Sequence, residues 1–191
     1  KGYSVNALIE EFTVGNDWEL DQNLVTSDCT ASAAHAEMLE SIGILEPEEK
    51  ESLLAGLADI IKKASDGSFT ITRENEDCHT AIENYLTEIC GEAGKKIHTG
   101  RSRNDQIQTA LRIWMRDFLF SCIEASVKLI KAVTEFADRH AMIPMPGRTH
   151  MQIAMPSSIG LWAGAYAEEL SDETAHLFSL LEIIDQSPLG S

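Results

Sequence analysis

The sequence predicts an all-α protein, with an N-terminal helical domain over residues 1–100 and the first part of a central helical bundle over residues 101–191. Two observations lead to this prediction. The 191 residues include only five Pro and 12 Gly, which is little turn-forming material for a protein built of many short strands. Residues 104–140 contain neither Gly nor Pro, and their apolar side chains recur at helical spacing.

The first helix is predicted over residues 18–42. Asp17 is a suitable cap for its beginning, and Gly43 is well placed just after its last turn. A second helix is predicted to begin at Pro47, because proline is favoured at the first helical position. The pair Asp66–Gly67 is a turn signal that ends this helix.

The segment 69–72 is short and rich in β-branched residues, so we expect it to be extended, although no second strand is evident to pair with it. A third helix is predicted over residues 77–90. Gly91 and Gly94 follow it and are expected to break it.

Two long helices are predicted in the second half, over residues 104–140 and 156–185. The first would be roughly 50 Å long at 1.5 Å per residue. Two such helices cannot cover all of their apolar faces by themselves, so more chain or other subunits must cover the rest. Small residues in the second helix would let a neighbouring helix approach closely; they are Gly160, Ala163, Gly164 and Ala167.

The composition excludes several classes of partner. The chain has 31 acidic and 15 basic residues, a formal net charge of −16 and a pI near 4.6. Such a charge repels phosphate, so we expect no binding to nucleic acid and none to an anionic membrane. No run of 18 apolar residues is present, and residues 1–11 lack the apolar region of a signal peptide.

The four cysteines form no Cys-x-x-Cys pair, and all lie in segments predicted to be helical; they are Cys29, Cys78, Cys90 and Cys122. Reduced thiols are therefore expected, and with them a cytoplasmic location. The sequence contains no His-Glu-x-x-His motif, no phosphate loop and no Gly-x-Gly-x-x-Gly motif after a strand. We accordingly predict no metal and no cofactor.

The first candidate site is the segment 94–106, which holds four of the 15 basic residues within nine positions. It leads directly into the first long helix, and helix N-termini favour anions through their free N–H groups. Ser102 and Asn104 add neutral hydrogen-bond donors, so a small polycarboxylate or phosphate would fit. The alternative is a solvated loop whose charges balance nearby acids.

The second candidate is the segment 146–152, a loop between the long helices that contains His150. Histidine is the side chain best suited to move protons near neutral pH, although a capping or core histidine is the alternative. Further upstream, Asp77 and His79 could orient other groups or cap the third helix. Asp21 and Asp28 project from one helix face, where simple solvated carboxylates are the alternative.

The segment 94–106 resembles the signature of the argininosuccinate lyase family. The segment 146–152 resembles the family's Thr-His loop, and residues 76–80 resemble its acidic Asp-x-His segment. Residues 188–191 resemble the start of its Pro-Leu-Gly-Ser segment. The resemblance covers essentially the whole chain in the family's order, and it ends less than halfway through a family chain.

The resemblance implies an all-α homotetramer, related to fumarase, aspartase and adenylosuccinate lyase, whose active sites gather segments from three subunits. It also implies the reaction, an anti β-elimination that cleaves argininosuccinate to arginine and fumarate in arginine biosynthesis. An aci-carboxylate dianion forms in this reaction, and its stabilisation needs dense cationic and hydrogen-bonding groups.

By the family's pattern, Asn104 and Thr149 would contact substrate carboxylates, Ser102 and Arg103 would belong to the same binding cluster, and His150 would belong to the acid–base machinery. Asp21 and Asp77 match acidic positions near the site, and Asp17 lies where many members have a substrate-binding Ser. Arg148 departs from the pattern, since many members have Tyr there.

The family's third signature is a Gly- and Ser-rich mobile loop that carries the catalytic serine, and it is absent from these 191 residues. We therefore expect this chain alone to be inactive. Two alternatives remain open. One is another lyase of the superfamily, since the Gly-Arg-Thr-His order at 147–150 is like that of the fumarase branch. The other is a non-catalytic, crystallin-like helical assembly protein.

Overall fold

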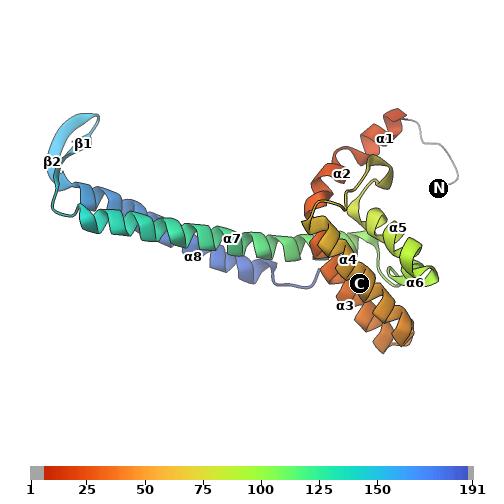
Figure 1. The fold of residues 1–191 in the computed structure, drawn as a ribbon. Coiled ribbons are helices and arrows are strands. Elements are labelled where there is room, and N and C mark those ends of the chain that lie inside the picture. Colours follow the sequence, from red (N-terminus) through yellow and green to blue (C-terminus); the bar gives the residue numbers. More distant parts are fainter. Residues whose placement is uncertain (1–6, 189–191) are drawn as a thin grey trace. The chain divides into compact units, whose positions relative to one another are not determined.

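The structure is a computed structural model that describes residues 7–188, and it confirms the all-α prediction apart from one small two-stranded sheet (Figure 1). The elements are α1 (Ala7–Val14), α2 (Asp17–Leu20), η1 (Asp21–Asn23), α3 (Val25–Ser41), α4 (Pro47–Ser65), η2 (Arg73–Asn75), α5 (Cys78–Cys90), α6 (Glu92–Lys96), α7 (Arg103–Arg139), β1 (Pro144–Thr149), β2 (Gln152–Ser158) and α8 (Ile159–Ile184).

The chain forms two compact units, which are described separately. The N-terminal unit comprises residues up to Trp114 together with 187 and 188, and the C-terminal unit comprises residues 115–186. The division falls within α7, whereas the sequence predicts a domain boundary at residue 100, which stays a prediction. No helix in residues 7–188 is both long and apolar enough to cross a membrane.

The core of the N-terminal unit lies among α3, α4, α5 and α6, where α3 packs on α4, α4 on α5 and α5 on α6 (Figure 1). Its largest fully buried apolar side chains are Leu39, Leu53, Leu57, Ile60, Ile82, Leu86 and Ile97. Each such side chain contributes about 1.5–3 kcal/mol through burial, so this unit has its own apolar core.

The predicted helix over residues 18–42 is wrong as a single element, because it is broken into α2, η1 and α3. Asp17 is not its cap; Asn16 occupies the N-cap of α2, without a side-chain bond. The break places two side chains against the distant segment 69–78. Asp21 Oδ2 accepts a hydrogen bond from the backbone N–H of Cys78 at 3.1 Å, and Gln22 reaches residues 69 and 71.

The segment 69–72 belongs to no helix or strand, and Thr72 at its end has the extended backbone that the sequence predicts. Gln22 takes the place of a partner strand. Its amide nitrogen donates to the Phe69 carbonyl at 3.0 Å, and its amide oxygen accepts from the Ile71 N–H at 3.0 Å. One side-chain amide thus satisfies both backbone groups that a neighbouring strand would otherwise bind.

Most predicted helix ends are confirmed. Pro47 is the first residue of α4, and Gly43 and Gly67 adopt φ values of 76° and 78° after the helices they follow. Gly91 ends α5, but Gly94 does not act as a breaker, because it lies inside α6. A Cβ at Gly94 would lie 2.5 Å from the carbonyl carbon of Leu86, so the absent side chain allows α6 to pack on α5.

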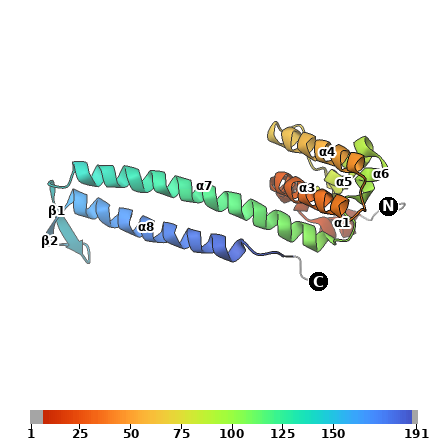
Figure 2. The ribbon, with the colours of Figure 1, turned by 90° about the horizontal axis from the view of Figure 1, so that it is seen from below.

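Figure 2 shows α8 running alongside the part of α7 that belongs to the C-terminal unit. The first long helix matches its prediction over 104–140 closely. The second begins at Ile159, capped by the Ser158 hydroxyl, which accepts from the Leu161 N–H at 3.0 Å. Its predicted start at residue 156 is wrong because residues 156–158 pair in β2. A close backbone approach is found at Gly160, where a Cβ would lie 2.4 Å from Ala141 Cα.

The segment 146–152, predicted to be a loop, is instead part of a β-hairpin and includes its turn. β1 and β2 are antiparallel, with an irregularity between Pro146 and Arg148. His150 and Met151 form the connection, with φ values of 46° and 64°. Two successive residues with positive φ are typical of a two-residue type I′ turn, whose twist matches that of the strands.

Candidate functional site

The residues predicted to form the site are divided between the two units. Five lie in the N-terminal unit, namely Asp21, Asp77, Ser102, Arg103 and Asn104, and two lie in the hairpin of the C-terminal unit, namely Thr149 and His150.

The two lysines of the basic segment are engaged by acids of the same unit. Lys95 Nζ lies 2.5 Å from Glu92, and Lys96 Nζ lies 2.6 Å from Glu49, whose pKa is held low first by this hydrogen bond. Both pairs are partly or largely exposed, so each adds little to stability. For these two lysines the structure therefore supports the alternative, in which the basic side chains of the segment balance nearby acids.

Arg103 and Asp77 are brought together at the beginning of α7. Arg103 donates from Nη1 to the Asp77 carboxylate and from Nη2 to Thr80 Oγ1, the latter at 2.7 Å. Asp77 also caps α5, because its Oδ1 accepts from the Thr80 N–H at 2.8 Å. Asp77 therefore has the capping role foreseen as an alternative and also aligns a cation at the helix start.

Asp21 lies at the same place, since its carboxylate binds the backbone N–H of the residue after Asp77. Asp21 is buried, and this burial raises its pKa, opposed by the bond from the Cys78 N–H and by the charge of His79. Asp28 is fully buried and accepts from His79. The interpretation of Asp21 and Asp28 as simple solvated carboxylates is thus wrong, because both lie within the folded unit.

Ser102 and Asn104 lie on either side of Arg103, and their side chains are exposed. The backbone N–H of Ser102 donates to Asp105 Oδ2 at 2.7 Å, which satisfies one of the free donors at the start of α7. Within residues 7–188, neither the Ser102 hydroxyl nor the Asn104 amide has a side-chain hydrogen-bond partner. Both groups are therefore available to a ligand.

In the C-terminal unit, His150 is exposed at the turn of the hairpin, with Thr149 beside it. The alternatives of a core or a helix-capping histidine are wrong for this residue, because it is neither buried nor next to a helix. Arg148 Nη1 donates to the Met151 carbonyl at 3.4 Å and so closes the turn. The hairpin presents Thr149 and His150 at its tip.

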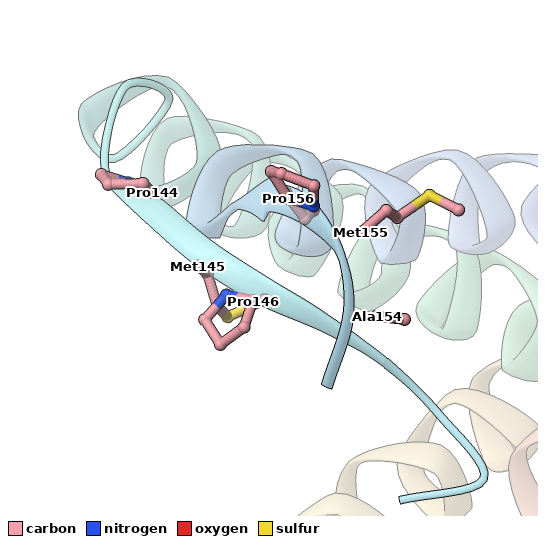
Figure 3. A pocket seen from close by; sticks show the side chains of 7 residues that line it. Pro144, Met145, Pro146, Ala154, Met155 and Pro156 are labelled. Atoms are coloured by element: carbon pink, nitrogen blue, oxygen red, sulfur yellow. The ribbon is translucent and has the colours of Figure 1, made fainter. Parts of the chain in front are cut away.

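The base of the hairpin has a shallow cavity of about 280 Å³ (Figure 3). Its lining comes from both strands and is almost entirely apolar; it consists of Pro144, Met145, Pro146, Ala154, Met155, Pro156 and Ser157. Such a lining offers no charge to a polycarboxylate, so the polar chemistry of the hairpin is confined to its tip.

The residues that could hold a metal are Asp28, Cys78 and His79, whose donor atoms lie within 4.8 Å of one another. Asp28 Oδ2 is directly bonded to His79 Nδ1 at 2.7 Å, and burial raises the pKa of the Cys78 thiol, which stays protonated. This geometry is that of a hydrogen-bonded pair in the core. All four cysteines are free thiols, as predicted.

Sequence reasoning missed the burial of several polar residues behind the basic segment. Asp28 and Ser32 on α3 and Gln106 in the first turn of α7 are buried, and His98, which precedes α7, is partly buried. The sequence signal for their burial was the polar pair at positions 28 and 32, which lie one helical turn apart within a stretch of small residues.

Comparison with known proteins agrees with this fold. The model of a family described as "Lyase" matches residues 4–191. The chain is similar to argininosuccinate lyases of Thermotoga neapolitana (44% identity), Bacteroides fragilis (46%) and Xanthomonas oryzae pv. oryzae (42%). These matches cover 100% of this chain but only 48%, 43% and 44% of the relatives, so the chain spans about half their length.

Among solved structures, a fumarate lyase:delta crystallin from Brucella melitensis in native form has the same fold, with a TM-score of 0.80 and 20% identity. This likeness covers 98% of the present chain and 48% of that one. The family model accounts for nearly every residue of the sequence. The chain therefore belongs to this lyase family.

Proposed function

We propose that this chain is the part of an argininosuccinate lyase that supplies substrate-binding groups and an acid–base histidine. The reaction is anti β-elimination of argininosuccinate to arginine and fumarate. The observation that most supports the proposal is identity of 42–46% over the whole chain with proteins of that name. The exposed donors of Ser102, Asn104 and the hairpin tip have the chemistry that this reaction needs.

The residues have distinct proposed roles. The Asn104 amide, the Ser102 hydroxyl and the Thr149 hydroxyl would donate hydrogen bonds to substrate carboxylates, where negative charge increases as the α-proton leaves. Arg103 would add positive charge to the same region, oriented by Asp77. His150 would transfer protons. Asp21, bonded to the start of α5, would complete the wall of the site. No cofactor and no metal enter the proposal.

We further propose that the complete protein is a cytoplasmic homotetramer. Its support is the series of large apolar side chains exposed along the C-terminal unit, for example Phe118, Phe120, Leu161 and Trp162. Many large apolar side chains exposed on one unit are typical of a protein interface. The four free thiols are compatible with a reducing compartment.

The test uses a chimera in which residues 1–191 replace the matching 48% of the Thermotoga neapolitana relative. We expect the chimera to release fumarate from argininosuccinate, measured by ultraviolet absorbance, and the 191-residue chain alone to release none. The unmodified relative is the positive control. Circular dichroism and light scattering establish that the chimera is folded and assembled.

Two results would contradict the proposal. A folded chimera that neither binds argininosuccinate in calorimetry nor cleaves it would favour a non-catalytic assembly protein. A chimera that instead acts on malate, aspartate or adenylosuccinate would favour another lyase of the superfamily. Fumarate release by the 191 residues alone would overturn only the proposal that this chain is inactive by itself.

A further inference from the structure

A buried polar cluster lies behind the basic segment, within the N-terminal unit. Asp28 and Ser32 on α3 are 0% exposed, and His79 on α5 and Gln106 on α7 are 2% exposed. Buried polar groups are unfavourable unless they are hydrogen-bonded, so the partners of each group define what the cluster does.

Asp28 connects α5 to α3. Its Oδ2 lies 2.7 Å from His79 Nδ1, and its Oδ1 accepts from the Ser32 hydroxyl at 3.3 Å. Because a carboxylate only accepts, His79 carries its proton on Nδ1. Ser32 uses its hydroxyl hydrogen for Asp28, and its oxygen therefore remains free to accept a bond from elsewhere.

That second bond comes from Arg101, whose Nη2 donates to Ser32 Oγ at 2.8 Å. The same nitrogen lies 3.2 Å from His98 Nδ1, and the amide nitrogen of Gln106 lies 2.7 Å from that imidazole atom. Both neighbours are donors, so His98 Nδ1 must be an unprotonated acceptor. Burial, followed by the charge of Arg101, lowers the pKa of His98 to about 4, in keeping with a neutral ring.

The segment 98–106 is thus bound to the unit at several points. Besides the bonds of Arg101 and Gln106, the Thr99 carbonyl lies 2.9 Å from His35 Nε2 on α3. Between these attached residues, the side chains of Ser102 and Asn104 remain exposed. The segment therefore has inward-facing residues that fix its backbone and outward-facing residues that are free to bind.

The partial burial of Arg101 is unfavourable to stability, so stability alone does not explain why an arginine occupies this position. Burial lowers its pKa, and its Nε is buried without a hydrogen-bond partner in the described part of the chain. A buried donor without a partner carries its full desolvation penalty, so this part of the Arg101 side chain is unfavourable to stability. The guanidinium does what an apolar side chain cannot, since its Nη2 joins Ser32 on α3 to His98 in the segment.

From these contacts we infer that Arg101 is a positioning residue, which acts through Ser32 and Asp28 to hold the segment 98–106 in the conformation that presents Ser102 and Asn104 to substrate. The substrate part of this inference rests on the proposed function, whereas the anchoring part does not. Arg101 is distinct in this from Arg103, which is exposed and paired with Asp77.

The anchoring is tested in the 191-residue chain with Arg101→Met, which keeps most of the volume and removes every donor. We expect amide hydrogen exchange in a peptide covering 98–106 to accelerate at least about tenfold, with exchange in α4 and the melting temperature nearly unchanged. Ser32→Ala, which removes both the acceptor for Arg101 and the donor to Asp28, should act in the same direction. The matched control is Lys62→Met, an exposed cation of α4 that makes no bond to the segment.

The consequence for substrate is tested with Arg101→Met and Arg101→Lys in the chimera. We expect KM for argininosuccinate to rise about tenfold while kcat changes less than about threefold, because displaced donors weaken binding. Arg101→Lys restores the charge without the fork and should recover only part of the loss.

The outcomes separate the two proposals. An inactive wild-type chimera counts against the proposed function, and the exchange data then decide the anchoring alone. An active chimera whose KM is unchanged by Arg101→Met would overturn the positioning role. Unchanged exchange at 98–106, or a uniform increase throughout the N-terminal unit, would also overturn it. If Arg101→Met fails to fold, Ser32→Ala provides both measurements.

Discussion

Individual residues in the N-terminal unit show that charge alone is a poor guide to the site. The basic segment is conspicuous in an acidic sequence, yet Lys95, Lys96 and Arg103 are each paired with an acid of the same unit. Among the residues described, the neutral donors of Ser102 and Asn104 have no side-chain hydrogen-bond partner. Binding of a carboxylate at this position therefore depends on oriented dipoles as much as on net positive charge.

The partly buried imidazole of His98 gives a pH prediction at the residue scale. Its pKa in the folded chain is about 4, against an ordinary value near 6.5. The unfolded chain thus binds more protons between these values, so stability is complete above about pH 6.5 and falls as the pH falls toward 4. The groups that affect His98 are Arg101, Asp28, His79, His35 and Glu83.

We expect the free energy of unfolding to be about 2 kcal/mol lower at pH 5 than at pH 7 because of His98. Urea unfolding at the two pH values measures this difference. His35, whose pKa is also lowered by burial, acts in the same direction. His98→Gln removes the ionisable imidazole, so the free energy of unfolding should depend less on pH in this variant. An equally steep pH dependence would show that other groups cause it.

At the scale of elements, the helices could be predicted from sequence because they are specified locally. The Gly- and Pro-free pattern of α7, Pro47 at the beginning of α4, and Gly43 after α3 are all local signals. The break between α2 and α3 could not be predicted, because its cause is the bonding of Asp21 and Gln22 to residues about 50 positions away.

The site residues were predictable to a similar extent. Exposed donors next to a helix start, such as Ser102 and Asn104, follow from local sequence. The hairpin that carries His150 does not, since its strands contain three prolines that normally argue against a strand. The role of Ser32 and Asp28 in holding Arg101 could not be predicted either, because it depends on contacts between distant segments.

Gly94 in α6 and Gly164 in α8 differ in how closely other atoms approach them, so their substitution tests the packing of α6 on α5. A Cβ at Gly94 would lie 2.5 Å from Leu86 and Thr87 backbone atoms, whereas one at Gly164 in α8 would have no atom within 4 Å. Gly94→Ala should therefore destabilise by about 1–3 kcal/mol, since backbone atoms must move. Gly164→Ala should stabilise by about 0.5–1 kcal/mol through helix propensity. Urea unfolding compares them, and equal effects would contradict the packing argument.

At the scale of the whole molecule, the two units differ in how their apolar side chains are covered. The N-terminal unit encloses its own core. The C-terminal unit leaves many large apolar side chains exposed on α7, the hairpin and α8, including Leu161 at 68% and Phe118 at 53% exposure. A surface of this kind is unfavourable in water, so it favours association with further protein.

This difference predicts that the 191-residue chain self-associates through its C-terminal unit. Leu161→Asp would place a charge in the proposed interface, and a charge buried without a partner opposes association. We expect sedimentation velocity to show concentration-dependent oligomers for the unmodified chain and a shift toward monomer for the variant, with the same helical circular dichroism. Ser171→Asp, which adds the same charge at an exposed polar position of the same helix, is the control for net charge. If the unmodified chain is monomeric at all concentrations, its exposed apolar side chains do not suffice for assembly, and the tetramer requires segments outside these 191 residues.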